Sequence, residues 1–398
     1  MQRTITQALR LALGISFFAF ILIGMNDGAV GVLLPEMQTT YHTGKDTISL
    51  LFLAGTFGYF TASFNNGLLL DKLGNRRFLL LATLMMGLGF ALLSSRPPFI
   101  LLLVGIVPIG FGVAMLDAGF NSYIASLPNK TALLNYLHAF YGTGALLGPL
   151  VASSFLALGW VWNSVYFVWI GIAVLVFVGI ALAFPRRTMA SHEEEQKAGG
   201  NVLFLALRQR TVWLAALFLL FYVGTEVSLG SWSFSFLTQE RGGQILFSGW
   251  IVSGYWVGLT LGRLLLGKVA QRIGSRRLIE ACLSGVVVGI LLVWIVPQLA
   301  VATFALFLTG FSLGPIFPTT IALLSDTLPS RILSSAIGFL ASLGSIGGAL
   351  LPWIAGNLAQ HFGLWTLLPY VMALTAIMLV LWVIIQTRPA RPEEIPKR

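Results

Sequence analysis

The sequence predicts an all-α membrane protein whose twelve transmembrane helices form two similar six-helix bundles. The prediction rests on composition, on the number of long apolar runs and on a polar loop that occurs twice. Of the 398 residues, 57% are hydrophobic and 10% are charged, whereas an ordinary soluble protein has about 25% charged residues. So little polar surface excludes a soluble globular protein, and so much apolar side chain excludes a disordered chain.

Apolar runs long enough to cross a bilayer follow one another along the chain. A hydrocarbon core about 30 Å thick requires roughly 20 apolar helical residues. The runs do not alternate apolar and polar residues, so they are not the strands of a β-barrel. Twelve runs begin near Leu11, Thr47, Phe78, Phe99, Asn135, Val165, Val212, Ile245, Leu278, Leu299, Leu333 and Leu364.

The basic residues predict the orientation in the membrane. The net charge is +10, but Lys and Arg lie in short clusters between apolar runs, which is a topology pattern and argues against nucleic-acid binding. With the N-terminus inside, 20 of the 24 Lys and Arg fall in cytoplasmic segments and three in external ones. We therefore expect a multi-pass protein of the plasma or inner membrane with both termini cytoplasmic. The single cysteine, Cys282, excludes an intrachain disulfide.

A polar interruption divides the spans six and six. Residues 185–210 contain a basic pair, three consecutive glutamates and two glycines, which is typical of a solvated linker. The sequence therefore predicts an N-terminal bundle over 1–184, a cytoplasmic linker over 185–210 and a C-terminal bundle over 211–398.

The two halves repeat one plan. The loop Gly67–Arg77 follows the second run, and Gly267–Arg277 follows the eighth, with both glycines and the Arg pair matching at an offset of 200. Gly144–Leu147 recurs as Gly348–Leu351. Internal repetition of a six-helix half is typical of secondary transporters, whose sites lie between the halves near the bilayer midplane.

The loop Gly67–Arg77 resembles the signature that follows the second helix of the major facilitator superfamily. Four further stretches are similar to the fucose permease-like sugar porters of that superfamily, namely Leu116–Asn121, Leu134–Ala145, Tyr222–Trp232 and Gly314–Pro318. This resemblance implies the major facilitator fold, proton-coupled import of a monosaccharide and a coupling carboxylate in the fourth helix, at Asp117. The first-helix acid, Asp27, lies one turn before the family's position, where this chain has Gly31, so the resemblance does not extend to fucose itself.

Three acids lie well within predicted spans, at Asp27, Asp117 and Glu226. A charge in the bilayer centre costs about 2.5–3.5 kcal/mol on insertion scales, so such a residue is a functional candidate by default. Arg263 is the only obvious opposite charge at similar depth. A carboxyl group that is protonated in one state and ionised in another can carry one proton per cycle, and we expect these three acids to couple protons. The alternative is that they only join helices through buried hydrogen bonds.

Amides, an imidazole and aromatic rings accompany these acids. Asp117 and Asn121 share one face of the fourth helix because they are four residues apart. Such groups supply the donors and acceptors that a polyhydroxylated ligand requires, although His and Asn also join membrane helices without binding a ligand. Most aromatic residues must face lipid or core, but a few could stack on a sugar ring. The predicted substrate-binding residues are Asn26, Asn121, Asn135, His138, Tyr141, Trp232 and Trp256.

The loop after the second run is a candidate gate. Asp71, Arg76 and Arg77 can pair with each other and with helix ends on the cytoplasmic side, which would hold an outward-open state. The alternative is that the arginines are simple positive-inside charge.

The preferred function is proton-coupled symport of a monosaccharide or similar solute by alternating access. The runner-up is a proton-coupled exporter of drugs or lipophilic metabolites, which the many Phe and Trp residues would suit. A non-transporting sensor or an enzyme would need a soluble domain or a catalytic motif, and none stands out. We therefore expect no enzymatic activity, no cofactor and no metal, and a monomer whose partners are the bilayer, protons and a small solute.

Overall fold

The computed structural model describes residues 2–128, 130–184 and 201–387, and these residues form helices joined by short turns. The predicted linker falls outside this description over 185–200. In order the elements are α1 (Gln2–Tyr41), α2 (Lys45–Ile48), α3 (Leu50–Ser94), α4 (Phe99–Ala125), α5 (Lys130–Ala157), α6 (Ser164–Ala183), α7 (Asn201–Arg208), α8 (Arg210–Ser235), the π-helical turn η1 (Phe236–Glu240), α9 (Ile245–Ile273), α10 (Ser275–Ile295), α11 (Leu299–Leu313), α12 (Ile316–Thr327), α13 (Ser330–Phe362), the 3₁₀ turn η2 (Leu364–Thr366) and α14 (Leu367–Thr387).

The described residues contain eleven helical segments long and apolar enough to cross a membrane. One of them, Lys45–Ser94, has 50 residues, which is enough for two spans at 1.5 Å per residue. It reverses at Gly74, whose φ of 70° and ψ of 158° are not helical. That backbone region is essentially restricted to glycine. The segment therefore supplies two spans, and the predicted all-α membrane fold with twelve spans is confirmed.

The repeated loop adopts one conformation in both halves. Gly274, 200 residues after Gly74, has a φ of 88° and a ψ of 147° and separates α9 from α10. In each copy the glycine turns the chain back into the bilayer, and an Arg pair follows. The structure thus gives a physical reason for the matched glycines in the two loops.

Several helices begin earlier in the sequence than the apolar runs from which they were predicted. The run near Asn135 belongs to α5, which starts at Lys130, and the run near Leu333 belongs to α13, which starts at Ser330. Polar residues continue a helix beyond the hydrocarbon layer because intrahelical hydrogen bonds do not require lipid. Apolar composition therefore marks the membrane portion of a helix and not its end.

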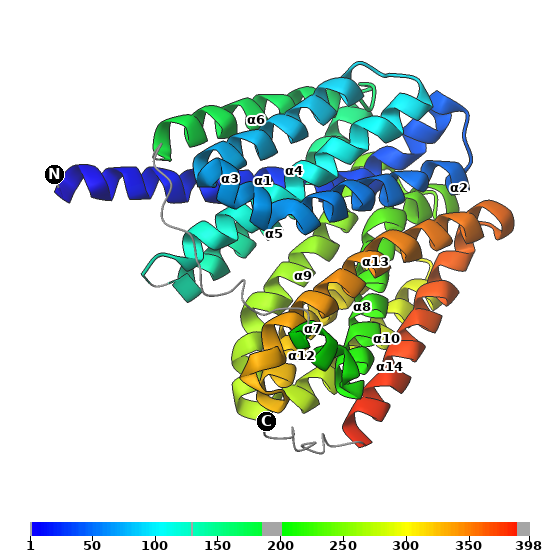
Figure 1. The fold of residues 1–398 in the computed structure, drawn as a ribbon. Helices are drawn as coiled ribbons and strands as arrows, with labels where there is room; N and C mark the ends of the chain where they lie inside the picture. The colour runs from blue at the N-terminus through cyan, green and yellow to red at the C-terminus, as the bar shows by residue number, and fades with distance from the viewer. Residues whose placement is uncertain (1, 129, 185–200, 388–398) are drawn as a thin grey trace.

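Helices α1–α6 form one half and α8–α14 the other (Figure 1). We call the side of the membrane on which α1 begins and α14 ends the terminal side, and the opposite side the far side. In Figure 1 the halves meet near α2 and the end of α13, on the far side, and diverge toward the two chain ends. The backbone N–H of Lys45 in α2 donates to Gln360 Oε1 in α13 at 2.7 Å across this far-side contact.

Two further helix pairs close the far side. Helix α1 meets α8 at Gly31, where a Cβ atom would lie 2.6 Å from the carbonyl oxygen of Ser231. Helix α5 meets α9, where the Ser253 hydroxyl donates to the Leu146 carbonyl at 3.0 Å. On the terminal side, by contrast, Tyr136 of α5 and Leu265 of α9 are 59% and 53% exposed. The halves are therefore in contact on the far side and apart on the terminal side.

Candidate functional site

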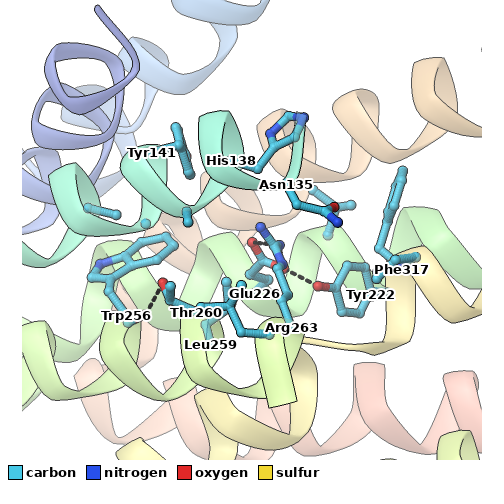
Figure 2. Close-up of a pocket in the computed structure, with 16 residues that line it drawn as sticks. Asn135, His138, Tyr141, Tyr222, Glu226, Trp256, Leu259, Thr260, Arg263 and Phe317 are labelled. Atoms are coloured by element: carbon cyan, nitrogen blue, oxygen red, sulfur yellow. Dashed lines mark hydrogen bonds and ion pairs between the residues drawn. The ribbon is translucent and has the colours of Figure 1, made fainter. Parts of the chain in front are cut away.

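A cavity of about 480 Å³ lies between the two halves. Its walls come from α5 of the first half and from α8, α9 and α12 of the second (Figure 2). Because the far-side halves of α5 and α9 are in contact, the cavity is open toward the terminal side. Its lining residues are Asn135, His138, Ala139, Tyr141, Gly142, Ala145, Tyr222, Val223, Glu226, Trp256, Leu259, Thr260, Arg263, Leu264, Phe317 and Pro318.

A charged pair occupies the wall formed by the second half. Arg263 Nη2 in α9 lies 3.2 Å from each carboxylate oxygen of Glu226 in α8. The hydroxyl of Tyr222, one helical turn before Glu226, donates to Glu226 Oε2. The Glu226 side chain is 12% exposed and that of Arg263 is 35% exposed. One cation and one anion neutralise each other here, so this wall carries no net charge.

A break in the tenth span supplies a second hydrogen-bond partner for the guanidinium group of Arg263. Helix α11 ends at Leu313 and α12 begins at Ile316. The carbonyl of Gly314 cannot accept the usual bond from the residue four positions on, because that residue is Pro318 and has no N–H. Arg263 Nε donates to this carbonyl at 3.3 Å instead. The break also brings Phe317 and Pro318 to the cavity wall.

Helix α5 presents polar side chains to the charged pair. Asn135 and His138 are exposed to the cavity, and Figure 2 shows both on the α5 side, opposite Arg263. The His138 ring packs edge-on against Phe20 of α1, with 5.7 Å between ring centroids. Tyr141 lies one turn further along the same face. Three of the predicted binding residues thus line the cavity together.

Asp27 lies one hydrogen bond behind the cavity wall. The Tyr141 hydroxyl donates to Asp27 Oδ2 at 3.1 Å, and Asn26 Nδ2 donates to Asp27 Oδ1 at 3.1 Å. Neither Asp27 nor Asn26 is among the described residues that line the cavity. The predicted first-helix acid therefore contacts the site through Tyr141.

Asp117 and Asn121 lie deeper in the first half. Asn121 Nδ2 donates to Asp117 Oδ1 at 2.9 Å, as their spacing of four residues on one helix allows. Neither Asp117 nor Asn121 is among the described residues that line the cavity. In this conformation the fourth-helix acid is thus separated from the cavity.

The two predicted tryptophans have different surroundings. Trp256 lines the cavity, and the hydroxyl of Thr260 donates to its carbonyl at 2.8 Å. Trp232 is fully buried, and its indole N–H donates to the Pro352 carbonyl at 2.9 Å, which joins α8 to α13. Trp232 lies away from the cavity in this conformation.

The predicted gating residues lie on the terminal side, where the second span turns at Gly74 into the third. Asp71 and Arg77 are exposed, while Arg76 Nη2 donates to the Ala181 carbonyl near the end of α6 at 2.7 Å. Among the side chains that the structure describes, the only ion pair joins Arg263 to Glu226. Asp71 therefore makes no ion pair while the terminal side is open, and the latch stays a prediction for the opposite conformation.

Sequence reasoning did not include Arg263, Tyr222 or Thr260 among the binding residues. Two signals were present in the sequence. Arg263 is a lone cation within a span, which must find a partner there, and Tyr222 precedes Glu226 by four residues, which places both on one helix face. The residues that the structure describes contain no group of three or more His, Cys, Asp or Glu that could hold a metal ion.

Comparison with known proteins agrees with this architecture. The sequence matches the profile of the Major Facilitator Superfamily over residues 16–248 and again over 229–398. It is 29% identical to "Bypass of stop codon protein 6" of Saccharomyces cerevisiae, in a match that covers 91% of this chain and 79% of the relative. It is 25% identical to "Glucose/mannose transporter GlcP" of Bacillus subtilis, with 85% of each chain covered.

A solved structure shares the fold. It is a bacterial homologue of the human lysosomal transporter Spinster, in an inward-facing and unoccupied conformation, with a TM-score of 0.79 and 13% identity. The match covers 97% of this chain and 99% of that one. Because the family profile matches both halves and the fold is the same, the chain belongs to the major facilitator superfamily and is a multi-pass membrane transporter, not an enzyme.

Proposed function

We propose that this transporter carries a neutral monosaccharide, or a similar polyhydroxylated solute, together with protons. The halves over 1–184 and 211–398 would move against each other around the central cavity, with 185–210 as the linker. The terminal side is then the cytoplasm, as the basic clusters predict, and the described conformation is inward-open. Symport with protons that enter the cell imports the solute across the plasma or inner membrane.

The observation that carries the proposal is the group of polar side chains that face one another in an otherwise largely apolar cavity. Asn135 and His138 face the Glu226–Arg263 pair across a space of about 480 Å³, within the range of small-molecule pockets. The charged pair is neutral overall, so the cavity favours an uncharged polar solute over an anion or a cation. Amide, imidazole and guanidinium groups match hydroxyl-rich ligands, and Trp256, although only 6% exposed, lines the same space. A relative named as a glucose/mannose transporter supports the same class.

The three membrane acids are the candidates for proton coupling, and their hydrogen-bond and charge partners differ. Glu226 already has a cationic partner, whereas Asp27 and Asp117 receive only neutral hydrogen bonds from Asn26, Tyr141 and Asn121. Desolvation without a counter-charge favours the protonated form of a carboxyl group. We infer that Asp27 and Asp117 take up and release the proton and that Asp117 does so when the opposite side is open.

The test is uptake by purified protein in proteoliposomes under an imposed pH gradient. We expect uphill accumulation of a radiolabelled hexose, and its loss in Asp117→Asn and in Asp27→Asn with exchange retained. The matched control is Asp326→Asn, which neutralises an exposed acid of α12 and should leave uptake unchanged. Gradient-driven efflux of lipophilic cations without hexose uptake would replace symport with drug export. Unchanged uphill uptake in Asp117→Asn would remove that acid from the mechanism.

A further inference from the structure

The hydroxyl of Tyr141 is the one described connection between the cavity and Asp27. Tyr141 forms part of the cavity wall, and its hydroxyl donates to Asp27 Oδ2 at 3.1 Å. The other carboxylate oxygen accepts from Asn26 Nδ2 at 3.1 Å. An amide nitrogen can only donate, whereas a phenolic oxygen can donate one hydrogen bond and accept another at once. Of the two partners of Asp27, therefore, only Tyr141 can receive a proton on one side and pass one on from the other.

Backbone packing fixes Tyr141 against Asp27. Helices α1 and α5 touch at Gly24, where a Cβ atom would lie 2.7 Å from the backbone nitrogen of Ala145 and 3.0 Å from the carbonyl carbon of Tyr141. They touch again at Gly28, where a Cβ atom would lie 3.1 Å from the Ala145 Cα. These two contacts flank Asp27 on α1, so the backbones that carry Tyr141 and Asp27 cannot move apart without separating the helices.

Tyr141 lies between charged groups of the two halves. Its hydroxyl donates to Asp27 of α1, and it shares the cavity wall with Glu226 of α8 and Arg263 of α9. His138 lies one turn away on α5 and also lines the cavity. Helix α6, which also packs on α1, carries no ionisable group other than Tyr166. Tyr141 thus lies where the acids of the first half meet the ion pair of the second.

We propose that Tyr141 is a relay and positioning residue that couples the protonation of Asp27 to solute binding; this proposal rests on the proposed proton symport. In the relay step the phenolic oxygen accepts a proton from hydronium in the cavity as its own hydrogen passes to Asp27 Oδ2. The products are water, an intact tyrosine and a neutral carboxyl group, so one proton has moved and no charge remains on the phenol.

The same step changes what the cavity offers to a solute. While Asp27 is ionised, its carboxylate accepts the hydrogen bond that the Tyr141 hydroxyl donates. Once protonated, Asp27 can donate to the phenolic oxygen, and the tyrosine hydrogen is released to a solute hydroxyl. Protonation therefore adds a hydrogen-bond donor to the cavity, and by linkage a bound solute favours the protonated acid to the same extent. Proton and solute binding thus reinforce each other.

The first test uses Tyr141→Phe, which removes only the hydroxyl and keeps the ring. Gradient-driven accumulation should fall at least about tenfold, since positioned proton transfer contributes roughly 10²–10⁴-fold. Exchange without a gradient should fall by a smaller factor, because it loses the hydrogen bond from Tyr141 to the solute but needs no proton transfer. Asp27→Asn should give a similar loss, and the double variant should be no worse than Asp27→Asn, because residues that act as one unit are not additive. Tyr136→Phe, an exposed tyrosine on the same helix, is the matched control.

A second measurement does not depend on transport. The carboxyl C=O band of Asp27, identified by its loss in Asp27→Asn, is recorded by infrared difference spectroscopy on lowering the pH. We expect this band to shift in Tyr141→Phe and not in Tyr136→Phe, because Tyr141 is the tyrosine of the two that donates a hydrogen bond to the carboxyl group. An unshifted band, accumulation within twofold of wild type in Tyr141→Phe, or independent losses that multiply in the double variant would each overturn the relay. Wild-type protein without gradient-driven uptake would overturn the proposed symport and leave the band shift as the test of the contact.

Discussion

Loss of Arg263 should destabilise the transporter because Glu226 then keeps a charge without a counter-charge. At 3.2 Å and an effective dielectric constant of about 20, the attraction between the two charges is about 5 kcal/mol. Water reaches the Arg263 side chain, which is 35% exposed, and screens part of this attraction. Tyr222 also continues to donate to the carboxylate. We therefore expect Arg263→Met to lower the free energy of unfolding by about 2–3 kcal/mol.

A double-mutant cycle separates the pair from the rest of the site. Glu226→Gln keeps the shape of the side chain and should cost about 1–2 kcal/mol, since Arg263 retains the Gly314 carbonyl and access to water. The double variant should be less destabilised than the sum of the two by at least about 1 kcal/mol, the size expected of directly contacting residues. Unfolding by SDS in mixed micelles, followed by tryptophan fluorescence, gives the four free energies.

The double-mutant cycle has a control variant and a result that would contradict the prediction. Arg331→Met removes an exposed arginine and should change the free energy of unfolding by no more than about 0.5 kcal/mol. Additive effects of Arg263→Met and Glu226→Gln, within about 0.5 kcal/mol, would mean that the two charges do not interact in the folded protein. The neutral, solute-facing wall inferred from their contact would then have no basis.

Two further substitutions test the fold and the conformation. Gly74→Ala should lower the free energy of unfolding by about 1–3 kcal/mol, because its φ of 70° and ψ of 158° suit only glycine. The control, Gly87→Ala, lies at a helical position with open space around it and should be neutral or slightly stabilising. Equal effects of the two substitutions would contradict the backbone argument. Gly31→Leu should shift the protein toward the far-side-open state, because a side chain there meets the Ser231 carbonyl. Spin labels on α2 and α13 measure this opening as an increase in their distance. An unchanged distance would show that the contact at Gly31 does not close the far side.

The fold could be predicted almost completely because the bilayer leaves few alternatives. Each span must be a helix of about 20 apolar residues, and the repeated loop then divides the spans into equivalent halves. The matched Gly74 and Gly274 proved to share one backbone conformation. What composition could not give was the end of each helix, as the early start of α5 at Lys130 shows.

The site could be predicted only in part, because sequence spacing fixes a face within one helix and not the direction of that face. Asn135, His138 and Tyr141 were predicted to bind the solute, and all three line the cavity from α5. Asp117 and Asn121 share a face of α4, but neither residue lines the cavity. Helix rotation and tilt are set by packing against neighbouring helices, and that packing depends on which side of the transporter is open.

The second half contributes a paired, neutral charge cluster to the cavity, whereas the first half keeps its two acids behind the wall. Helix α5 lies between these arrangements, because it carries His138 toward Arg263 and Tyr141 toward Asp27. Any rocking of the halves that separates α5 from α9 on the far side must also change the surroundings of Tyr141. A single helix would thereby make the proton sites of one half sensitive to solute bound against the other, which is the coupling that symport requires.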